Sequence, residues 1–183
     1  SRQAVSKISK IFNIKKVGHG GTLDPLATGV LPIAIGEATK LISFIQNKNK
    51  KYSFVIKWGE TTQTDDIEGK VLETSLLRPN KEQIIKVLTM FKGTIYQKPP
   101  IFSAIKINGR RSYKLARNNV DIIHKERLVK IQKLSLKKII SIDSAEFEVE
   151  CSKGTYVRSL ARDIAQKLNT KGHVTKLRRL SVG

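Results

Sequence analysis

Cysteine and histidine are scarce in this sequence. Cys151 is the only cysteine among 183 residues, which excludes a disulfide within the chain and favours a reducing compartment, so we expect a cytoplasmic protein. The three histidines, His19, His124 and His173, stand too far apart for the spacing of metal ligands, and we expect no metal site. No apolar run is long enough to span a membrane and no signal peptide is recognisable, so no membrane location is expected.

Acidic residues are also few. The chain has 15 Asp and Glu against 35 Lys and Arg, a formal net charge of +20 at pH 7. A charge of this sign and size indicates a polyanionic partner: RNA, DNA or an anionic membrane surface. The Lys-, Ile- and Asn-rich composition of an AT-biased genome accounts for part of the magnitude but not for the sign. With 39% apolar residues, the chain can form one globular domain with a core.

Apolar periodicity predicts both helices and strands. Helical spacing occurs in four segments: 4–12, 38–45, 80–91 and 157–168. Asn80 is expected to cap the third helix, with Gln83 at the capping-box position. Strand patterns occur in three segments: 52–58, 128–136 and 145–151. Because helices and strands mix without a regular strand–helix–strand order, we predict an α+β fold with a mixed, largely antiparallel sheet flanked by helices.

The segment 96–119 differs from the rest of the chain. It is rich in Lys and Arg and contains Pro99-Pro100 and Asn108-Gly109, which favour turns. We therefore expect a long excursion from the core, and such loops often carry function.

Asp24 is the most informative carboxylate, because it lies in a loop with four glycines between residues 18 and 29 and is followed by Pro25. Glycine lets a ligand approach the main chain closely, and Pro25 biases Asp24 toward an extended or turn backbone. Asp-Pro alone most often marks a turn or a helix N-cap. The glycine density, with His19 and Thr22 nearby, favours a functional carboxylate, either a nucleophile or a base. No second carboxylate lies nearby in sequence, so a two-carboxylate glycosidase is not indicated.

Tyr156 and Arg158 lie where the strand over 145–151 gives way to the last helix. The helix dipole disfavours an Arg in the first turn, so we expect an anionic partner for Arg158, either Asp24 or a phosphate. A plain surface arginine is the alternative. Tyr52, near the start of its strand, is either a core aromatic or a platform on which a nucleic-acid base stacks.

Two kinds of charge cluster remain. The acidic turn 64–69 lacks the spacing of an EF-hand, so we predict a turn held by local hydrogen bonds rather than a calcium site. The basic stretches mark either a solvated face or a surface that tracks phosphates, and they comprise 106–111, Lys114, Arg117, 125–138 and 171–179.

The motifs in these segments are similar to those of one family. Residues 18–32, GHGGTLDPLATGVLP, resemble the catalytic motif of the TruB family of tRNA pseudouridine synthases. Three further segments resemble family motifs in order and spacing: 36–40 followed by 51–52, 151–159, and 173–179. Similarity extends over nearly the whole chain, so the signal is specific.

This resemblance implies a pseudouridine synthase fold and an RNA-modifying activity. The implied reaction isomerises uridine to pseudouridine in the T loop of tRNA (position 55), by glycosidic bond cleavage, rotation of the base and C5–C1′ bond formation. No cofactor is required, the partner is the T stem-loop of tRNA, and no obligate protein partner is implied, so a monomer is expected. The segment 96–119 would be an RNA-gripping insertion.

The resemblance also implies roles for individual residues. Asp24 matches the catalytic aspartate, and Arg158 matches the arginine that pairs with it. Tyr52 matches the tyrosine that stacks on the target base. The other implied substrate-binding residues line the pocket, contact the nucleotide or lie beside the site: Tyr156, His19, Leu177 and Asp66.

The resemblance concerns the catalytic domain, to which residues 1–183 are assigned. Family members usually begin with a strand carrying a Lys-Pro-x-Gly motif, and bacterial members often carry a C-terminal PUA-type domain; this chain starts after the first and stops before the second. Two alternatives are a catalytically silent RNA-binding or RNA-folding module and a structural ribosome-associated protein. Both explain the charge, but neither requires the set of Asp24, Tyr52 and Arg158.

Overall fold

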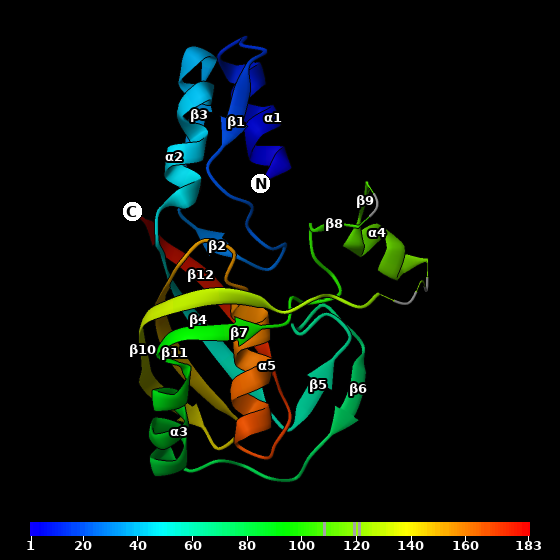
Figure 1. The fold of residues 1–183 in the computed structure, drawn as a ribbon, viewed down its shortest axis with the longest axis vertical. Helices are drawn as coiled ribbons and strands as arrows, with labels where there is room; N and C mark the ends of the chain where they lie inside the picture. Colours follow the sequence, from blue (N-terminus) through cyan, green and yellow to red (C-terminus); the bar gives the residue numbers. More distant parts are fainter. Residues whose placement is uncertain (108, 119, 121) are drawn as a thin grey trace.

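The computed structural model describes the chain except for Asn108, Asn119 and Asp121, so the parts of the expected insertion at Asn108 and Asn119 lie outside the described residues. The centre of the fold is a six-stranded sheet (Figure 1). Its strand order is β2 (Thr28–Gly29), β12 (Gly172–Val182), β4 (Lys50–Trp58), β11 (Ser144–Cys151), β10 (Arg127–Ser141) and β7 (Gly93–Gln97). β2 pairs with β12 in parallel and the other neighbours are antiparallel, which confirms the predicted α+β class and mixed sheet.

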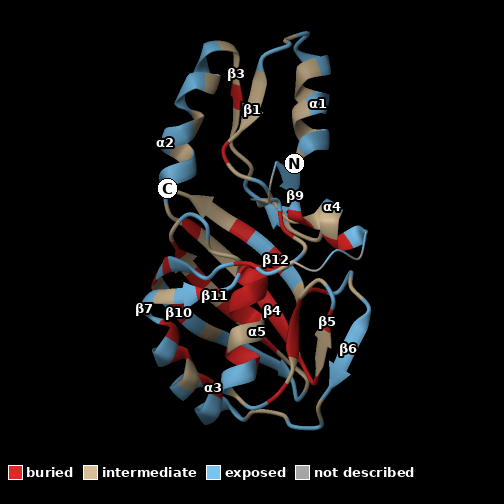
Figure 2. Ribbon diagram, turned by 45° about the vertical axis from the view of Figure 1, so that its right-hand side comes forward, coloured by how far each residue is buried: buried red, intermediate tan, exposed pale blue. Residues whose placement is uncertain are grey.

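Two helices cover one face of this sheet. α5 (Val157–Lys167) lies against β12 and β4, and α3 (Lys81–Leu88) lies against β10 (Figure 1). The apolar stripe predicted for the last helix is buried on the sheet, and Figure 2 shows the buried residues concentrated along α5 and β4. The aromatic centre of the core stacks the rings of Phe54 and Phe147 at 5.4 Å, with Trp58 edge-on to Phe147. Burial of this stripe fixes the start of α5 beside the sheet.

The predicted third helix begins and ends where its sequence signals lie. Asn80 Oδ1 accepts a hydrogen bond from Gln83 N, and Gln83 Oε1 accepts one from Asn80 N, so the predicted capping box is confirmed. The helix continues as the short 3-10 helix η2 (Thr89–Phe91). The strand predicted over 145–151 also alternates as expected, with the side chains of its odd-numbered residues buried under the helices.

An N-terminal arm projects from the sheet (Figure 1, top). It consists of α1 (Arg2–Ile11), the pair β1 (Val17–His19) and β3 (Ile33–Ile35), the 3-10 helix η1 (Gly36–Leu41) and α2 (Ile42–Asn47). The helices predicted over 4–12 and 38–45 are present, although the first half of the second is 3-10. No residue of α1, η1 or α2 is buried, and Figure 2 shows the arm as mostly exposed or half-buried.

Two further excursions leave the sheet. The hairpin of β5 (Glu60–Thr62) and β6 (Val71–Thr74) carries the acidic turn, which hydrogen-bonds to β12 through Ile67 N and Val174 O at 3.0 Å. The β7–β10 connection (residues 98–126) contains β8 (Lys106–Ile107), β9 (Arg110–Arg111) and α4 (Ser112–Arg117). It covers most of the expected 96–119 insertion, whose first two residues still belong to β7. None of the helices in the described part of the chain is long and apolar enough to cross a bilayer.

The basic run 171–179 is not a solvated surface. It forms the greater part of β12, which lies inside the sheet between β2 and β4. Arg179 is 1% exposed and His173 is 3% exposed, whereas the neighbouring Arg178 is exposed. The alternative of a solvated face is therefore wrong for Arg179 and His173.

Candidate active site

The loop that carries Asp24 crosses from β1 in the arm to β2 at the sheet edge. Ala27 N donates to Asp24 O at 2.9 Å, so Asp24 stands at a turn, and its side chain remains 27% exposed. Gly29, at the end of this loop, has φ +103°, and a Cβ there would lie 2.1 Å from Arg179 O. Glycine is therefore required for β2 to approach β12 and to hold the loop at this edge.

Arg158 grips the Asp24 carboxylate from the first turn of α5. Its Nε donates to Asp24 Oδ2 and its Nη2 to Asp24 Oδ1, both at 2.9 Å. The guanidinium is 4% exposed. Of the two anionic partners expected for Arg158, the structure selects Asp24. Two parallel charge-assisted hydrogen bonds fix the direction of the carboxylate as well as its charge.

The remaining N–H groups of Arg158 are also used. Nη1 donates to Thr64 O at 2.8 Å and to Asp66 Oδ2 at 3.2 Å, and Nη2 donates to Phe102 O at 3.1 Å. With the two bonds to Asp24, all five donors of the guanidinium have a partner. Arg158 is thus immobilised between two carboxylates and joins three segments that are distant in sequence.

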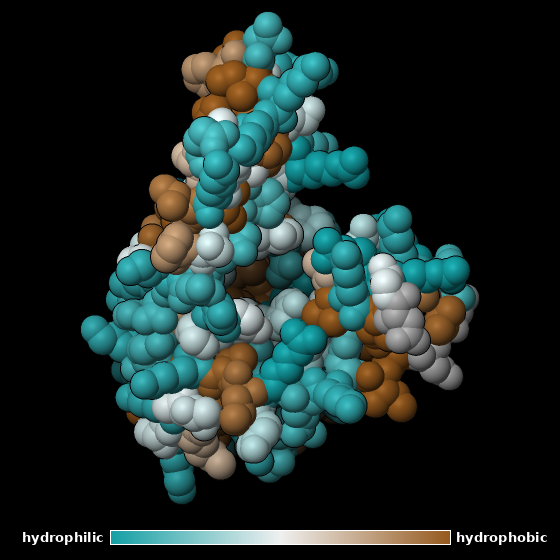
Figure 3. Space-filling view, turned by 45° about the horizontal axis from the view of Figure 1, so that its top comes forward, coloured by the Kyte–Doolittle hydropathy of each residue, from teal (hydrophilic) through white to brown (hydrophobic). Residues whose placement is uncertain are grey.

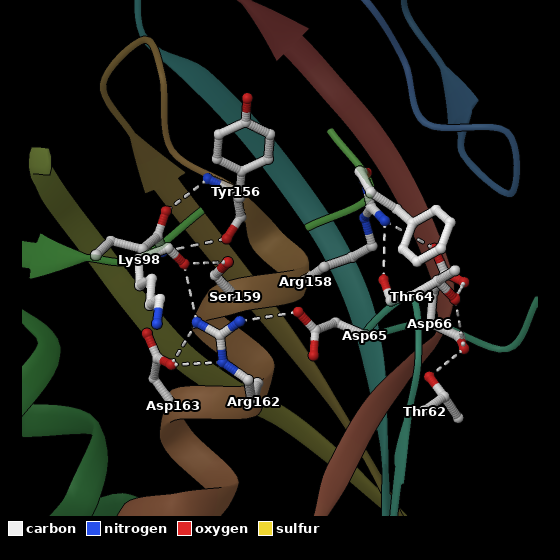
Figure 4. Close-up of polar contacts among 12 residues, drawn as sticks. Thr62, Thr64, Asp65, Asp66, Lys98, Tyr156, Arg158, Ser159, Arg162 and Asp163 are labelled. Atoms are coloured by element: carbon white, nitrogen blue, oxygen red, sulfur yellow. Dashed lines mark hydrogen bonds and ion pairs between the residues drawn. The ribbon is translucent and has the colours of Figure 1, made fainter. Parts of the chain in front are cut away.

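Asp66 holds the other side of this arginine (Figure 4). Its side chain is 1% exposed, and its Oδ1 accepts from Thr64 Oγ1 at 2.5 Å and from Glu68 N at 3.0 Å. The prediction of an acidic turn with local hydrogen bonds is confirmed. Its contact with Arg158 is an additional long-range role.

One turn further along α5, a second cluster secures the start of the β7–β10 connection (Figure 4). Arg162 Nη1 pairs with Asp65 Oδ2 at 2.9 Å, and Arg162 Nη2 donates to Lys98 O at 2.9 Å. Ser159 Oγ donates to the same carbonyl at 2.8 Å. Burial raises the pKa of Asp65, and the charge of Arg162 opposes that rise. These contacts hold the connection against the helix that presents Arg158.

A cavity of about 320 Å³ opens in front of Asp24. Its walls include Tyr52 and Leu177 from the sheet, Tyr156 from the N-cap of α5, and Ala104 from the β7–β10 connection. Figure 3 shows a hollow between the N-terminal arm and the part of the surface formed by this connection. The cavity therefore offers one carboxylate beside two aromatic rings and aliphatic groups.

Both tyrosines are neutral in this setting. Burial raises the pKa of Tyr52, with nearby Arg179 acting in the opposite direction. Burial also raises the pKa of Tyr156. Their rings are thus apolar surfaces with un-ionised hydroxyls at neutral pH.

The structure divides the residues predicted for the site into three groups. Asp24, Tyr52, Tyr156 and Leu177 line the cavity, whereas Arg158 and Asp66 lie behind Asp24 and hold it. His19 is half-buried on β1; its Nδ1 accepts from Gly21 N at 3.3 Å, and it is not among the residues that line the cavity.

The residues predicted for the site do not include two buried cations that line the cavity, Lys50 and Arg179. Lys50 is 7% exposed and Arg179 is 1% exposed. Arg179 is the register partner of Tyr52 across β12 and β4, and Lys50 precedes Tyr52 by two positions on β4. The alternation that predicted the Tyr52 strand would have reached Lys50 by one further step. Within the described residues, no group of three His, Cys, Asp or Glu side chains could hold a metal ion.

The sequence of this chain is similar to those of known proteins. Residues 9–157 match the family described as TruB family pseudouridylate synthase (N terminal domain). The chain is 52% identical over 183 residues to tRNA pseudouridine synthase B of Bradyrhizobium diazoefficiens, covering all of this chain and 53% of that protein. It is 50% identical over 182 residues to the protein of the same name from Agrobacterium fabrum, covering 58% of it. The chain thus spans about half the length of the curated relatives it matches.

Solved structures with the same fold belong to larger assemblies. A chain in the crystal structure of a Cbf5–Nop10–Gar1 complex matches with a TM-score of 0.75 at 30% identity, over all of this chain and 45% of that one. A chain in an H/ACA RNP bound to a substrate RNA containing 2′-deoxyuridine matches with a TM-score of 0.71 at 26% identity, over all of this chain and 43% of that one.

Proposed function

The chain belongs to the TruB family of pseudouridylate synthases, and from this membership we propose that it isomerises uridine to pseudouridine in the T loop of tRNA. One observation supports the proposal most: the Asp24 carboxylate, held by two 2.9 Å bonds from buried Arg158, faces a cavity walled by Tyr52 and Tyr156. We assign residues 1–183 to the catalytic domain, with 96–119 as its RNA-gripping insertion.

In this proposal Asp24 acts on the ribose of the target nucleotide. It either attacks C1′ or takes a ribose proton, and in both cases the N1–C1′ bond breaks. The freed uracil turns in the cavity and C5 bonds to C1′. If Asp24 attacked C1′, its bond to C1′ breaks in this step; if it took a ribose proton, the ribose regains a proton. The C5 proton leaves and N1 gains one. Atoms balance with no oxidant or hydrolysis, so Asp24 needs no cofactor for the step. Arg158 aims the carboxylate, because its two parallel hydrogen bonds fix the direction of both oxygens.

The cavity walls would hold the base. A volume of about 320 Å³ is at the lower end for a small-molecule site, which suits one nucleoside removed from its stack. Tyr52 would replace the lost stacking, a contact worth roughly 1–3 kcal/mol per base. Tyr156 and Leu177 would confine the uracil while it turns. Asp66 would support this geometry from behind, by holding Arg158.

The surrounding surface would bind the stem-loop. His19 stands on β1 beside the Asp24 loop, where it would meet the target nucleotide or its neighbour. Burial lowers the pKa of His19, so it would approach the RNA as a neutral imidazole rather than as a cation. The basic residues of β8, β9 and α4 would contact phosphates by charge. We propose that the protein acts as a monomer on tRNA.

A catalytically silent RNA-binding module remains the competing function. The buried ion pair disfavours it, because binding alone needs no carboxylate held toward RNA. Release of tritium from an unmodified tRNA labelled at uridine C5 distinguishes the two, since only isomerisation displaces that hydrogen.

A further inference from the structure

Two buried arginines flank the same cavity, and they differ in their partners. Arg158 uses all five of its donors, and two carboxylates balance its charge. Arg179 is 1% exposed, yet among the described residues no carboxylate forms an ion pair with it. A buried charge without a counter-ion is costly, so its presence calls for an anion supplied from elsewhere.

Only two of the five guanidinium N–H groups of Arg179 donate to carbonyl oxygens. Nε donates to Val30 O at 2.7 Å and Nη2 donates to Gly21 O at 3.1 Å. These two bonds fasten the side chain to the loop on either side of Asp24. The other three N–H groups, two on Nη1 and one on Nη2, face no carboxylate in the described part of the chain, and the Tyr52 hydroxyl lies beside them, where Arg179 opposes the rise in pKa that burial causes. Arg179 lines the cavity, so these donors are available at its wall.

Lys50 adds a second buried cation beside it. Lys50 Nζ donates to three carbonyls at the end of α2: Gln46 O at 2.5 Å, Lys48 O at 2.6 Å and Ile45 O at 3.5 Å. No carboxylate balances its charge in the described residues. Burial lowers the pKa of Lys50, and the charge of Arg179 lowers it further. All three Nζ donors are used, so Lys50 contributes positive charge beside Arg179 rather than a free N–H group.

The charges around the cavity are therefore unbalanced. Among the described residues that line it, Lys50, Lys153 and Arg179 are cationic, and Asp24 alone is acidic. Arg158 offsets only one of its two carboxylates, Asp24 and Asp66, so one negative charge remains against the three cations, and the net charge around the cavity is positive. If the occupant is a nucleotide within RNA, as the proposed function holds, its only anionic groups are the phosphodiesters on either side of it.

We propose that Arg179, assisted by Lys50, forms a phosphodiester subsite that binds a phosphate flanking the target nucleotide and so sets its ribose against Asp24. This inference rests on the proposed function and names how the same site takes hold of its substrate. The planar guanidinium suits two oxygens of one phosphate. Because Arg179 also fastens the loop around Asp24, a bound phosphate and the carboxylate share one support.

Neighbouring Arg178 provides a matched control. It lies on the same strand, is exposed, and its Nη1 contacts Thr28 Oγ1 at 3.4 Å. It does not line the cavity. Arg178→Gln and Arg179→Gln therefore remove the same charge from adjacent positions, one outside the cavity and one inside it.

The test combines these variants with RNA stem-loops in which single phosphates are replaced by neutral methylphosphonates. For the wild type, we expect neutralising one phosphate flanking the target uridine to weaken binding by about 10- to 100-fold, the effect of one charge-assisted contact. Arg179→Gln should weaken binding to the unmodified RNA by a similar factor, and the neutral linkage should then add almost nothing. With Arg178→Gln the neutral linkage should retain its full effect.

Circular dichroism and thermal melting establish whether each variant folds. If Arg179→Gln does not fold, Arg179→Lys, which keeps the charge but lacks the fork, replaces it and should show a partial loss. Two results would overturn the subsite. One is that the losses of affinity from an Arg179 variant and from a neutral linkage are strictly additive. The other is that neutral linkages on both sides of the target change the dissociation constant of the wild type by less than twofold. The dissociation constants test the subsite even where no tritium is released. A failure of the subsite is therefore distinguished from a failure of the proposed isomerase activity, which tritium release tests.

Discussion

Arg158 and Asp24 lie 134 positions apart in sequence and meet through two hydrogen bonds of 2.9 Å. The same guanidinium binds Asp66 of the acidic turn and Phe102 O of the β7–β10 connection. One buried side chain thus ties the candidate catalytic loop to the segment proposed to grip RNA. A disturbance of that segment is therefore expected to reach the carboxylate.

Replacing Arg158 by Lys should reduce turnover more than affinity. A single ammonium cannot make the parallel pair of bonds to Asp24, so the carboxylate loses its fixed direction. A misplacement of this kind costs on the order of 100-fold in turnover, while the dissociation constant of the stem-loop should change by less than about threefold. Single-turnover kinetics and binding titrations measure the two separately. Arg178→Lys, at an exposed position of β12 that does not line the cavity, is the control and should keep its turnover. Equal losses of turnover and affinity would contradict this role of Arg158.

Replacing Asp66 by Asn should destabilise the fold. The change keeps the side-chain volume but leaves Arg158 without one of its two counter-charges in a site that is 1% exposed. We expect the free energy of unfolding to fall by about 1–3 kcal/mol, as measured by urea titration. Asp163→Asn is the matched change, because Asp163 pairs with Arg162 where the two side chains are 24% and 26% exposed, and it should cost less than about 1 kcal/mol. A similar loss in both variants would argue against a special role for Asp66.

Substitution of Gly29 by Ala should cost more stability than the same substitution at Gly36. Both have positive φ, but a Cβ on Gly29 would lie 2.1 Å from Arg179 O, while a Cβ on Gly36 meets nothing within 4 Å. Gly36→Ala should therefore cost only the strain of the left-handed backbone, about 1–2 kcal/mol. Gly29→Ala should cost about 4 kcal/mol or more and separate β2 from β12. Thermal melting of both variants measures the difference, and equal melting temperatures would contradict the proposed close contact.

Cys151 gives a prediction for alkaline pH. Burial raises the pKa of its thiol from 9.0 to about 11. The folded pKa is above the unfolded one, so the contribution of the thiol to stability is complete below pH 9 and is lost as the pH rises to about 11. The total loss should be about 2–3 kcal/mol, and it should be absent from Cys151→Ala.

Urea titrations of both proteins at several pH values test this. The cavity left by Cys151→Ala lowers its stability by a constant amount at every pH, so the informative quantity is the difference between the two curves. That difference should shrink above pH 9. Curves that stay parallel would show that the thiol does not titrate with a raised pKa.

Local periodicity was sufficient to predict the elements with an unbroken pattern. β11 alternates without interruption and α5 carries a complete apolar stripe, so both were predicted closely from the sequence. The N-cap at Asn80 was predictable because the capping box lies within four residues. The helix-dipole argument for Arg158 reduced its partner to Asp24 or a phosphate.

Long-range features could not be predicted in the same way. β12 was missed because register shifts after Val174 and Arg179 break its period, and because its many cations resemble a surface. The contact of Asp66 with Arg158 depends on a bridge between Asp66 and Val174, which the sequence around the acidic turn does not reveal. The unbalanced charge of Arg179 is a property of the whole cavity and of no single motif.

Tritium release tests most directly the proposal that Asp24 catalyses isomerisation of uridine in tRNA. An unmodified tRNA transcript carrying tritium at uridine C5 is incubated with the wild-type chain and with Asp24→Asn, and both released tritium and RNA binding are measured. We expect tritium release by the wild type alone, with RNA bound equally by both proteins. Release by Asp24→Asn at the wild-type rate, or RNA binding by the wild type with no release, would contradict it.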